Sequence, residues 1–519
     1  MTGFEDLDDD VLYVILDFLY LERFDILQSL RLTSSRLKDF VDALANRTVS
    51  LVDDEIHERI TYRLVERLTD PSDKIRYHVR ALNVVDFKGD EDSYCLNTAL
   101  IADCLRHFQR LDIFNWKCDA PLPLKLLDNV QHRFPRAQFC ASVKSIDQTL
   151  LSIPQLHRLE VSVPYGEISG DQSISLFRAL KQALLHLPSL RYLCLDTHQD
   201  ATVGRLEGAA LDRLQLPLGL GDQLPSLVSL HLRSNYYVFD VDHCKVLLAS
   251  VDCNTLRSLT IGAPNPTAFF EVFIGNLPRL SYLDIPFVPA RDNPIDFRLQ
   301  AWTNFIARLD NLKELVLRLQ DFDVRSGFAK MLGEIHGPSL SQLSLQARQV
   351  DGLGPHYIGN IRKFLWKFVK LRSLSMAFPD IRSYHRCPEC EGHQWGEPNH
   401  FSFVPPLPSL RDVNLSIRAP PSERALYTYI NKHAHCAICH LWVTFVERSE
   451  SQLETLSIRF WRWEMTGRQT CLKEVIYDTT RLRGRLTVRV RHNREIPVVV
   501  YKEVWEEVQD RKMLVAFEV

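Results

Sequence analysis

The sequence predicts an α/β fold in which three N-terminal helices precede an irregular solenoid of alternating short parallel strands and helices. Two observations support this prediction. Apolar residues recur at spacings of three and four through about the first 45 residues, which is the pattern of amphipathic helices. Farther along, short runs with alternating apolar residues are separated by helical stripes such as DHCKVLLAS, AFFEVFIGNL, LQAWTNFIARL and GFAKMLGEI. Each such unit can bury its apolar face only against its neighbours.

Composition limits the classes of function. The chain has 519 residues, of which 45% are hydrophobic, so it can bury substantial cores. Its 62 Lys and Arg against 65 Asp and Glu exclude a general nucleic-acid binder. No apolar run approaches the ~20 residues of a membrane span. The acidic N-terminus MTGFEDLDDD is unlike a basic leader, so we expect the cytoplasm or nucleus, where its 12 Cys would be thiols or metal ligands.

The N-terminal segment predicts three short helices. Asp8, Asp9 and Asp10 suit the start of the first, because carboxylates cap free amides and complement the helix dipole. Ser34 can cap the third. The apolar stripes of the three helices are Val11, Leu12, Ile15, Leu16 and Leu19; Phe24, Leu27 and Leu30; and Leu37, Phe40, Val41 and Leu44. So small a module buries little apolar surface alone, and its excess predicts a partner.

Residues 4–45 resemble an F-box, the adaptor-docking motif of cullin-type ubiquitin ligases. The resemblance lies in Leu7, the paired apolar residues of the first helix, Asp25 and the segment LRLTSSRL. Asp8 stands where the family usually has Pro, and the usual Trp of the third helix is absent; fungal-type members are similar in this respect. The resemblance implies that a Skp-type adaptor binds Leu7, Val11, Leu12, Ile15, Leu16, Leu19, Leu27 and Leu30. Alternatively, these side chains are simply the core of a helical cap.

The repeats begin at about residue 75. Runs such as LPSLVSLHL and LDNLKELVL end in the alternating pairs Leu230-x-Leu232 and Leu315-x-Leu317, which predict short strands with one buried face. This region resembles an irregular leucine-rich-repeat domain, and LVSLHLRSN also has the family's Asn, Asn235. An ordinary α/β sheet with crossover helices is the alternative. We therefore expect an F-box at 1–48, a linking strand and helix at 49–74, and a repeat domain for target binding at 75–519.

The outward positions of the predicted strands are candidate contacts for a target protein, because a repeat domain presents a long rigid row of side chains. Solvated surface residues are an equally good interpretation of these positions. The candidates are His231, Arg233, Arg318, Gln346 and Arg348.

Two CxxC pairs indicate a structural zinc site. Cys387 and Cys390 lie in a polar insertion at about 384–401, and Cys436 and Cys439 lie one turn apart on a predicted helix. Four thiolates suit tetrahedral zinc, and zinc would order an insertion that has little core of its own. The long spacing between the pairs leaves two unrelated thiol pairs as the alternative. Neither pair clearly has the strand-to-helix setting of a thioredoxin-like redox centre.

Near the C-terminus, RLRGRLTVRVRHNR predicts a strand with Arg485, Arg489 and Arg491 on one face. These guanidinium groups suit an acidic or phosphorylated peptide. The alternative is salt bridging to the acidic segment YKEVWEEVQD that follows. No phosphate-binding loop, nucleophile elbow, HExxH helix or dinucleotide motif has a fitting context.

The sequence therefore predicts a non-enzymatic, substrate-recruiting subunit of a cullin-RING (SCF-type) ubiquitin ligase. The F-box would bind a Skp-type adaptor joined to the cullin core, and the repeats would bind an unknown target. A repeat scaffold whose F-box-like helices only dock an adaptor or cap the solenoid is the alternative. A zinc- or thiol-dependent enzyme is a third hypothesis, and it requires metal and turnover.

Overall fold

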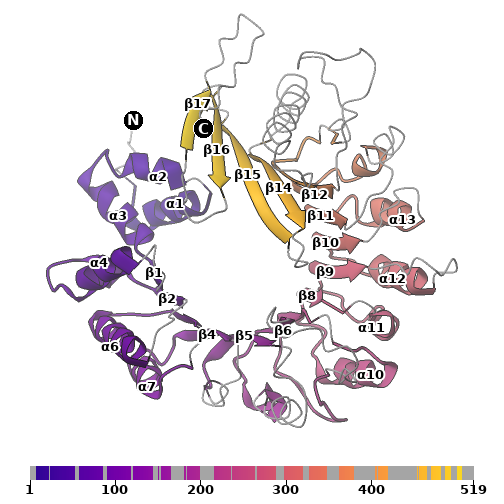
Figure 1. Cartoon of the computed structure of the whole chain (residues 1–519), viewed down its shortest axis with the longest axis horizontal. Coiled ribbons are helices and arrows are strands. Elements are labelled where there is room, and N and C mark those ends of the chain that lie inside the picture. Colours follow the sequence, from indigo (N-terminus) through magenta and orange to yellow (C-terminus); the bar gives the residue numbers. More distant parts are fainter. Residues whose placement is uncertain are drawn as a thin grey trace, which may run out of the picture. The chain divides into compact units, whose positions relative to one another are not determined.

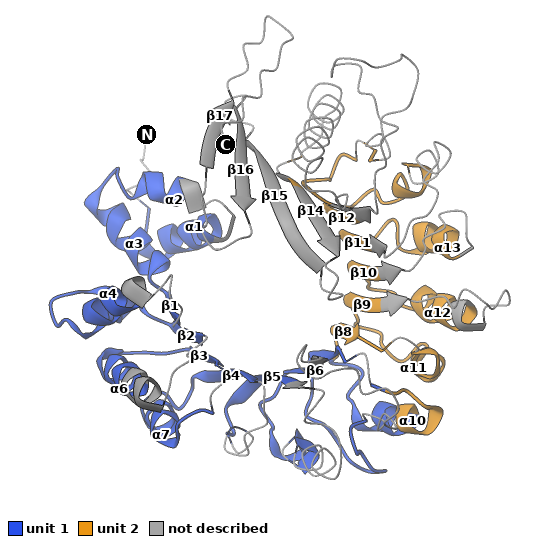
Figure 2. Cartoon of the chain, in the orientation of Figure 1, with its two compact units in different colours: residues 1–237, 245–255 blue, residues 238–244, 256–519 orange. Residues whose placement is uncertain are grey.

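Parallel strands alternate with helices along much of the computed structural model (Figure 1). The chain forms two units, residues 1–237 with 245–255 and residues 238–244 with 256–519 (Figure 2). The structure describes residues 7–22, 24–52, 58–85, 91–118, 121–143, 150, 153–164, 180–182, 184–198, 215–234, 237–263, 266–287, 297–319, 327–347, 362–378, 404–405, 407–418, 453, 455–463, 469–480, 485–492 and 500–504.

The first unit begins with the three-helix module, formed by α1 (Asp9–Glu22), α2 (Phe24–Leu30) and α3 (Ser35–Ala45). All three helices lie where the apolar stripes predict them. The strands that follow are β1 (Thr48–Val52), β2 (Ala81–Val85), β3 (Ile113–Lys117), β4 (Gln138–Val143), β5 (Leu156–Pro164), β6 (Tyr192–His198) and β7 (Ser229–Leu232). The helices between them are α4 (Glu58–Thr69), α5 (Ile75–His78), α6 (Glu91–His107) and α7 (Leu124–Arg133).

Each strand of the first unit pairs in parallel with the next along the chain, from β1 to β7. Helices α4, α6 and α7 lie on one side of these strands (Figure 1). Leu159, Leu193 and Leu230 occupy one register row across β5, β6 and β7, and all three are buried. Because side chains alternate along a strand, the residues between these leucines lie on the face opposite the helices.

The repeating step is visible in the backbone hydrogen bonds. The carbonyl of Arg47, just before β1, accepts from the two amides of Arg80 and Ala81 at 2.8 and 2.9 Å. In the second unit, the Ser281 carbonyl accepts from Lys313 and Glu314 in the same way, at 2.9 Å each. The carbonyl at the same position of a repeat therefore accepts from two backbone amides of the following repeat. This is expected where each repeat contacts its neighbours.

The second unit continues the alternation. Its parallel strands are β8 (Ser258–Ile261), β9 (Tyr282–Phe287), β10 (Glu314–Leu319), β11 (Gln342–Ala347), β12 (Ser373–Phe378), β13 (Asp412–Arg418) and β14 (Thr455–Trp463). Its helices are α11 (Thr267–Phe273), α12 (Phe297–Ala307) and α13 (Gly327–Ile335), and α10 (Val241–Ser250) has residues in both units. The sequence predicted α10 to α13 from their apolar stripes and, from alternation, the strands around Leu230 and Leu315.

The last three strands depart from the predicted parallel arrangement. Strands β15 (Gln469–Thr480), β16 (Arg485–His492) and β17 (Val500–Val504) form antiparallel pairs with the strands that precede them. The prediction of parallel strands throughout is therefore wrong for this end of the chain. The reason is connection length, since residues 464–468 and 481–484 suffice for a hairpin, whereas a parallel crossover needs a dozen residues or more.

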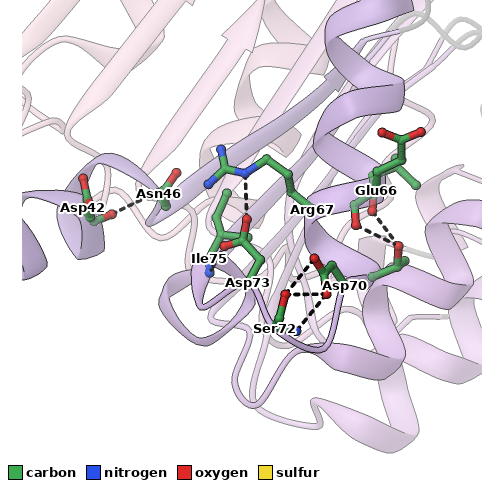
Figure 3. Close-up of polar contacts among 10 residues, drawn as sticks. Asp42, Asn46, Glu66, Arg67, Asp70, Ser72, Asp73 and Ile75 are labelled. Carbon is green, nitrogen blue, oxygen red and sulfur yellow. Dashed lines mark hydrogen bonds and ion pairs between the residues drawn. The ribbon is translucent and has the colours of Figure 1, made fainter.

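The segment predicted to link the helical module to the repeats is itself part of the first repeat. Strand β1 pairs with β2, and its Val49 and Leu51 are buried. A polar turn joins α4 to α5, and its contacts are drawn in Figure 3. There the Asp73 carboxylate accepts from Arg67 Nε at 2.8 Å and from the Ile75 amide at 2.9 Å. No helix among the described residues has the length and apolar character of a membrane span.

Replacing Asp73 with Ala should lower the free energy of opening of the α4–α5 region by about 1 kcal/mol near neutral pH, because both contacts are lost. Asp73→Asn keeps an acceptor for the amide but loses the charge, so its effect should be smaller. Hydrogen exchange of the α4 and α5 amides in the full chain measures both effects.

The same contact should depend on pH. The hydrogen bonds from Arg67 and from the Ile75 amide hold the pKa of Asp73 below its ordinary value. The stabilisation is therefore complete above the unfolded-state pKa of about 3.9 and is lost as pH falls through the lower folded-state pKa. A difference between wild type and Asp73→Ala that is as large near pH 2 as near pH 7 would contradict this assignment.

Candidate functional site

The three-helix module has a complete core of its own. Each helix contributes side chains that are at most 3% exposed. The core consists of Leu12, Leu16, Leu27, Leu37, Val41 and Leu44. Leu7, Leu19, Tyr20, Leu30 and Phe40 are partly buried and pack against it. The apolar spacing of the sequence therefore closes a small hydrophobic cluster, with about 1.5–3 kcal/mol for each large side chain that is fully buried.

Polar contacts fix the ends of the helices around this core. The Ser34 side chain accepts from the Leu37 amide at 3.2 Å, which confirms the predicted cap of α3. Arg36 donates to the Leu7 carbonyl at 2.7 Å and also contacts Asp9 in the first turn of α1. The start of α1 is thereby tied to α3, which is far from it in sequence but packed against it in the module.

A second apolar stripe of α1 faces away from the core. Val11, Val14 and Phe18 are 47%, 68% and 63% exposed, and Ile15 beside them is half-buried. Their spacings of three and four place these side chains on one side of the helix. We call Val11, Val14, Ile15 and Phe18 the α1 stripe. Because the core is already filled by other residues, the α1 stripe is apolar surface that a partner can cover.

The eight residues predicted to bind an adaptor divide into three groups. Leu12, Leu16 and Leu27 are 0% exposed and belong to the module core, so in this conformation they support the module from within. The second group is half-buried and consists of Leu7, Ile15, Leu19 and Leu30. Val11 is exposed.

Sequence reasoning missed Val14 and Phe18, although a signal was present. Apolar residues occupy more of the α1 circumference than one buried stripe requires, since they fall on both sides of Leu12 and Leu16. When the apolar face of a helix is wider than its own core needs, part of that face remains available to another molecule.

A second candidate surface lies on strands β5, β6 and β7, on the face opposite the helices. We call Arg158, Glu160, Tyr192, His231 and Arg233 the Tyr192 cluster. Arg158 donates to Glu160 Oε1 from Nη2 at 2.5 Å and from Nε at 3.1 Å. The Arg158 guanidinium carbon lies 3.9 Å from the Tyr192 ring centroid, and the His231 ring centroid lies 4.8 Å from it. The cluster is thus ordered by an ion pair, a cation–π contact and a tilted contact between two rings, across three strands.

Burial and charge set the protonation states in this cluster. Burial, followed by the positive charges of Arg233 and Arg158, lowers the pKa of His231 to about 4, so this histidine is neutral at physiological pH. Burial opposes the charge of Glu160, but the hydrogen bond and charge of Arg158, helped by Tyr192 and Ser142, hold its pKa below the ordinary value. Burial also raises the pKa of the Tyr192 hydroxyl.

The predicted strand-face contacts are found in different settings. His231 is only 5% exposed, whereas Arg233 beside it is exposed. Arg318 of β10 and Gln346 of β11 are register partners. Arg348 lies outside the described residues. The structure therefore brings His231 and Arg233 together with the other members of the Tyr192 cluster.

The three C-terminal arginines lie on β16, in the strand that the sequence predicted. The register places Glu474 of β15 opposite Arg491, and Glu503 of β17 opposite Thr487, which alternates with the arginines. Arg485 pairs in register with Thr480, and Arg489 with Ile476. Of the three arginines, Arg491 therefore has an acidic residue as its register partner on β15.

The paired cysteines Cys387, Cys390, Cys436 and Cys439 lie outside the described residues, as does the insertion at about 384–401. Among the residues that the structure does describe, no group of three or more His, Cys, Asp or Glu is placed to hold a metal ion. Burial raises the pKa of the Cys104 and Cys244 thiols to about 12 each. These two side chains are therefore protonated and act as small hydrophobic residues.

In comparisons with known proteins, no family model and no curated sequence matches this chain. A solved leucine-rich-repeat-containing protein, LegL7 from Legionella pneumophila, is 15% identical, with a TM-score of 0.34 over 62% of this chain and 97% of that one. The leucine-rich-repeat protein LIC12759 from Leptospira interrogans is 12% identical, with a TM-score of 0.27 over 76% of this chain and 90% of that one. The description of this chain as a repeat protein rests on its own strand pairing and backbone hydrogen bonds.

The division of α1 into a buried and an exposed stripe predicts that two substitutions differ greatly in their effect on stability. Leu16→Ala should lower the free energy of opening of α1 by about 2–5 kcal/mol, because it leaves a cavity in the module core. Phe18→Ala should change it by less than about 0.5 kcal/mol, because Phe18 is mostly in solvent. Hydrogen exchange of the α1 amides in the full chain distinguishes the two, and equal effects would show that the stripes are misassigned.

The zinc prediction is tested by metal content. If the two cysteine pairs share one ion, atomic absorption should find about one zinc for each purified chain, and Cys387→Ser should release it. Cys104→Ser, at a buried thiol in the described part of the chain, is the control and should keep the metal. Purified chain with no zinc would leave the four residues as two unrelated thiol pairs.

Proposed function

We propose that this chain recruits target proteins to a cullin-RING ubiquitin ligase, with the three-helix module bound to a Skp-type adaptor and the repeats bound to the target. The observation that carries the proposal is the α1 stripe, which is exposed apolar surface on a module whose own core is complete. The resemblance of residues 4–45 to an F-box supports the choice of partner, and the parallel strand-helix repeats support a protein-binding scaffold.

The α1 stripe has the chemistry of a protein interface. Burying Val14 and Phe18 in a partner would contribute about 1.5–3 kcal/mol each, and aromatic side chains near the centre of an interface often dominate its affinity. Asp10 and Asp17 border the stripe on the same helix, and Asp17 pairs with Arg47 at 3.2 Å, so this edge of the stripe is polar. An adaptor that fits this surface would present an apolar groove with basic side chains at its edge.

In this proposal the chain contributes proximity rather than covalent chemistry. The target would be held near a ubiquitin-loaded enzyme, which raises the effective concentration of its lysines at the transfer site. No residue of this chain would form a bond to ubiquitin. The function therefore depends on two separate surfaces, one on the helical module and one on the repeats.

Co-purification with a Skp-type adaptor tests the first surface. Val14→Asp and Phe18→Asp should each weaken adaptor binding by about 30-fold or more, because each places a charge in an apolar interface. Tyr62→Asp is the matched control, since Tyr62 of α4 is 43% exposed but lies outside the α1 stripe. Substitution of Leu12 would be a poor test, because its loss would unfold the module.

Unchanged adaptor binding by Val14→Asp and Phe18→Asp together would contradict the proposal. A second measurement separates the receptor from a plain scaffold. If the chain and adaptor also co-purify with a cullin, the ligase assignment is supported. Adaptor binding with no cullin would instead favour a repeat scaffold that uses the adaptor without delivering a target.

A further inference from the structure

The Tyr192 cluster has features of a second binding site, separate from the three-helix module. It lies on strands of the first unit, away from the helices, and its members come from β5, β6 and the end of β7. We propose that this cluster binds a carboxylate of a protein partner, held between Arg158 and Arg233 against the Tyr192 and His231 rings. The inference rests on the proposed function only in taking that partner to be the recruited target.

The two arginines of the cluster have hydrogen-bonding capacity for a ligand. Arg158 uses Nε and Nη2 for Glu160, and its Nη1 makes no hydrogen bond to another of the residues that the structure describes. Arg233 is exposed and forms no ion pair with any side chain that the structure describes. Guanidinium groups present several donors in a fixed plane that fits a carboxylate. Two such groups beside one ring pair are a suitable receptor for an anionic oxygen.

The side chains of the cluster are held in place by contacts with one another. The Glu160 carboxylate holds the Arg158 guanidinium, which lies over Tyr192, and His231 lies against the same aromatic ring. The register fixes these contacts, because Arg158 is the direct strand partner of Tyr192, and Cys194 of the same strand is the partner of His231. A site held in this way loses little side-chain entropy when a ligand binds.

The charges around the two arginines bear on the charge of the ligand. Glu160 and Asp196 both lie close enough to act on the charge of Arg233. Because these two acidic groups offset the two arginines, the site carries little net charge, and a carboxylate leaves it with one excess negative charge where a phosphate leaves nearly two. The chemistry therefore favours an aspartate or glutamate side chain of the partner over a phosphorylated residue.

The test uses the full chain and three pools of N-acetylated, C-amidated pentapeptides, in which the central residue is Glu, Gln or phosphoserine and the others are randomised. Fluorescence anisotropy should show that the Glu pool binds more tightly than the Gln and phosphoserine pools. Arg233→Ala should weaken binding of the Glu pool by about tenfold or more. Arg63→Ala, at an exposed arginine of α4, is the matched control and should have no effect.

Tyr192→Phe keeps the ring and should retain more binding than Tyr192→Ala, which also separates loss of the site from loss of one hydroxyl. Equal affinity for the Glu and Gln pools, tighter binding of the phosphoserine pool, or an Arg233→Ala variant that binds as wild type would each overturn the inference. Adaptor co-purification is measured in parallel with Arg233→Ala. Loss of Glu-pool binding with adaptor binding retained is the result expected of this variant. If the wild-type chain binds the adaptor but does not prefer the Glu pool, this inference alone fails and the proposed function stands.

Discussion

The repeated burial of apolar residues on one face of each strand is the constraint on which the structure depends. In the second unit, Leu283, Leu315, Leu343 and Leu374 occupy one continuous register row of β9 to β12, and each is at most 1% exposed. A strand with such a residue cannot be stable alone, because its apolar face must be covered by a helix and flanked by neighbouring strands. The fold is therefore built from contacts between neighbouring strand-helix repeats.

This constraint leaves the other face of the strands available for polar chemistry. Side chains that alternate with the buried row can differ from one repeat to the next at little cost in stability, because they do not take part in core packing. The Tyr192 cluster occupies such positions, since Arg158 and Glu160 flank the buried Leu159. The same alternation that buries the leucines thus aligns charged and aromatic side chains of neighbouring strands into one surface.

Much of the fold was predictable because the spacing of apolar residues within each short segment indicates a helix or a strand. The three helices of the module, the Ser34 cap and helices α10 to α13 follow from apolar spacing, which depends only on nearby positions. The antiparallel end was not predicted, because strand direction depends on connection length and pairing rather than on the alternation within β15 or β16. Similarly, His231 and Arg233 could be named as strand-face residues, but their association with Arg158 and Tyr192 depends on register between distant segments.

Helix α1 shows why burial must be known before a contact residue is assigned. Leu12 and Phe18 are both apolar residues of one helix, and the sequence alone gives each the same chemical reason to meet a partner. The core of Leu27, Leu37 and Val41 decides between them, because it already covers Leu12 and leaves Phe18 in solvent. A partner that needed Leu12 would have to open the module and lose about 2–5 kcal/mol of core packing, whereas one that binds the α1 stripe gains apolar burial without that loss. The energetics therefore favour docking on the closed module.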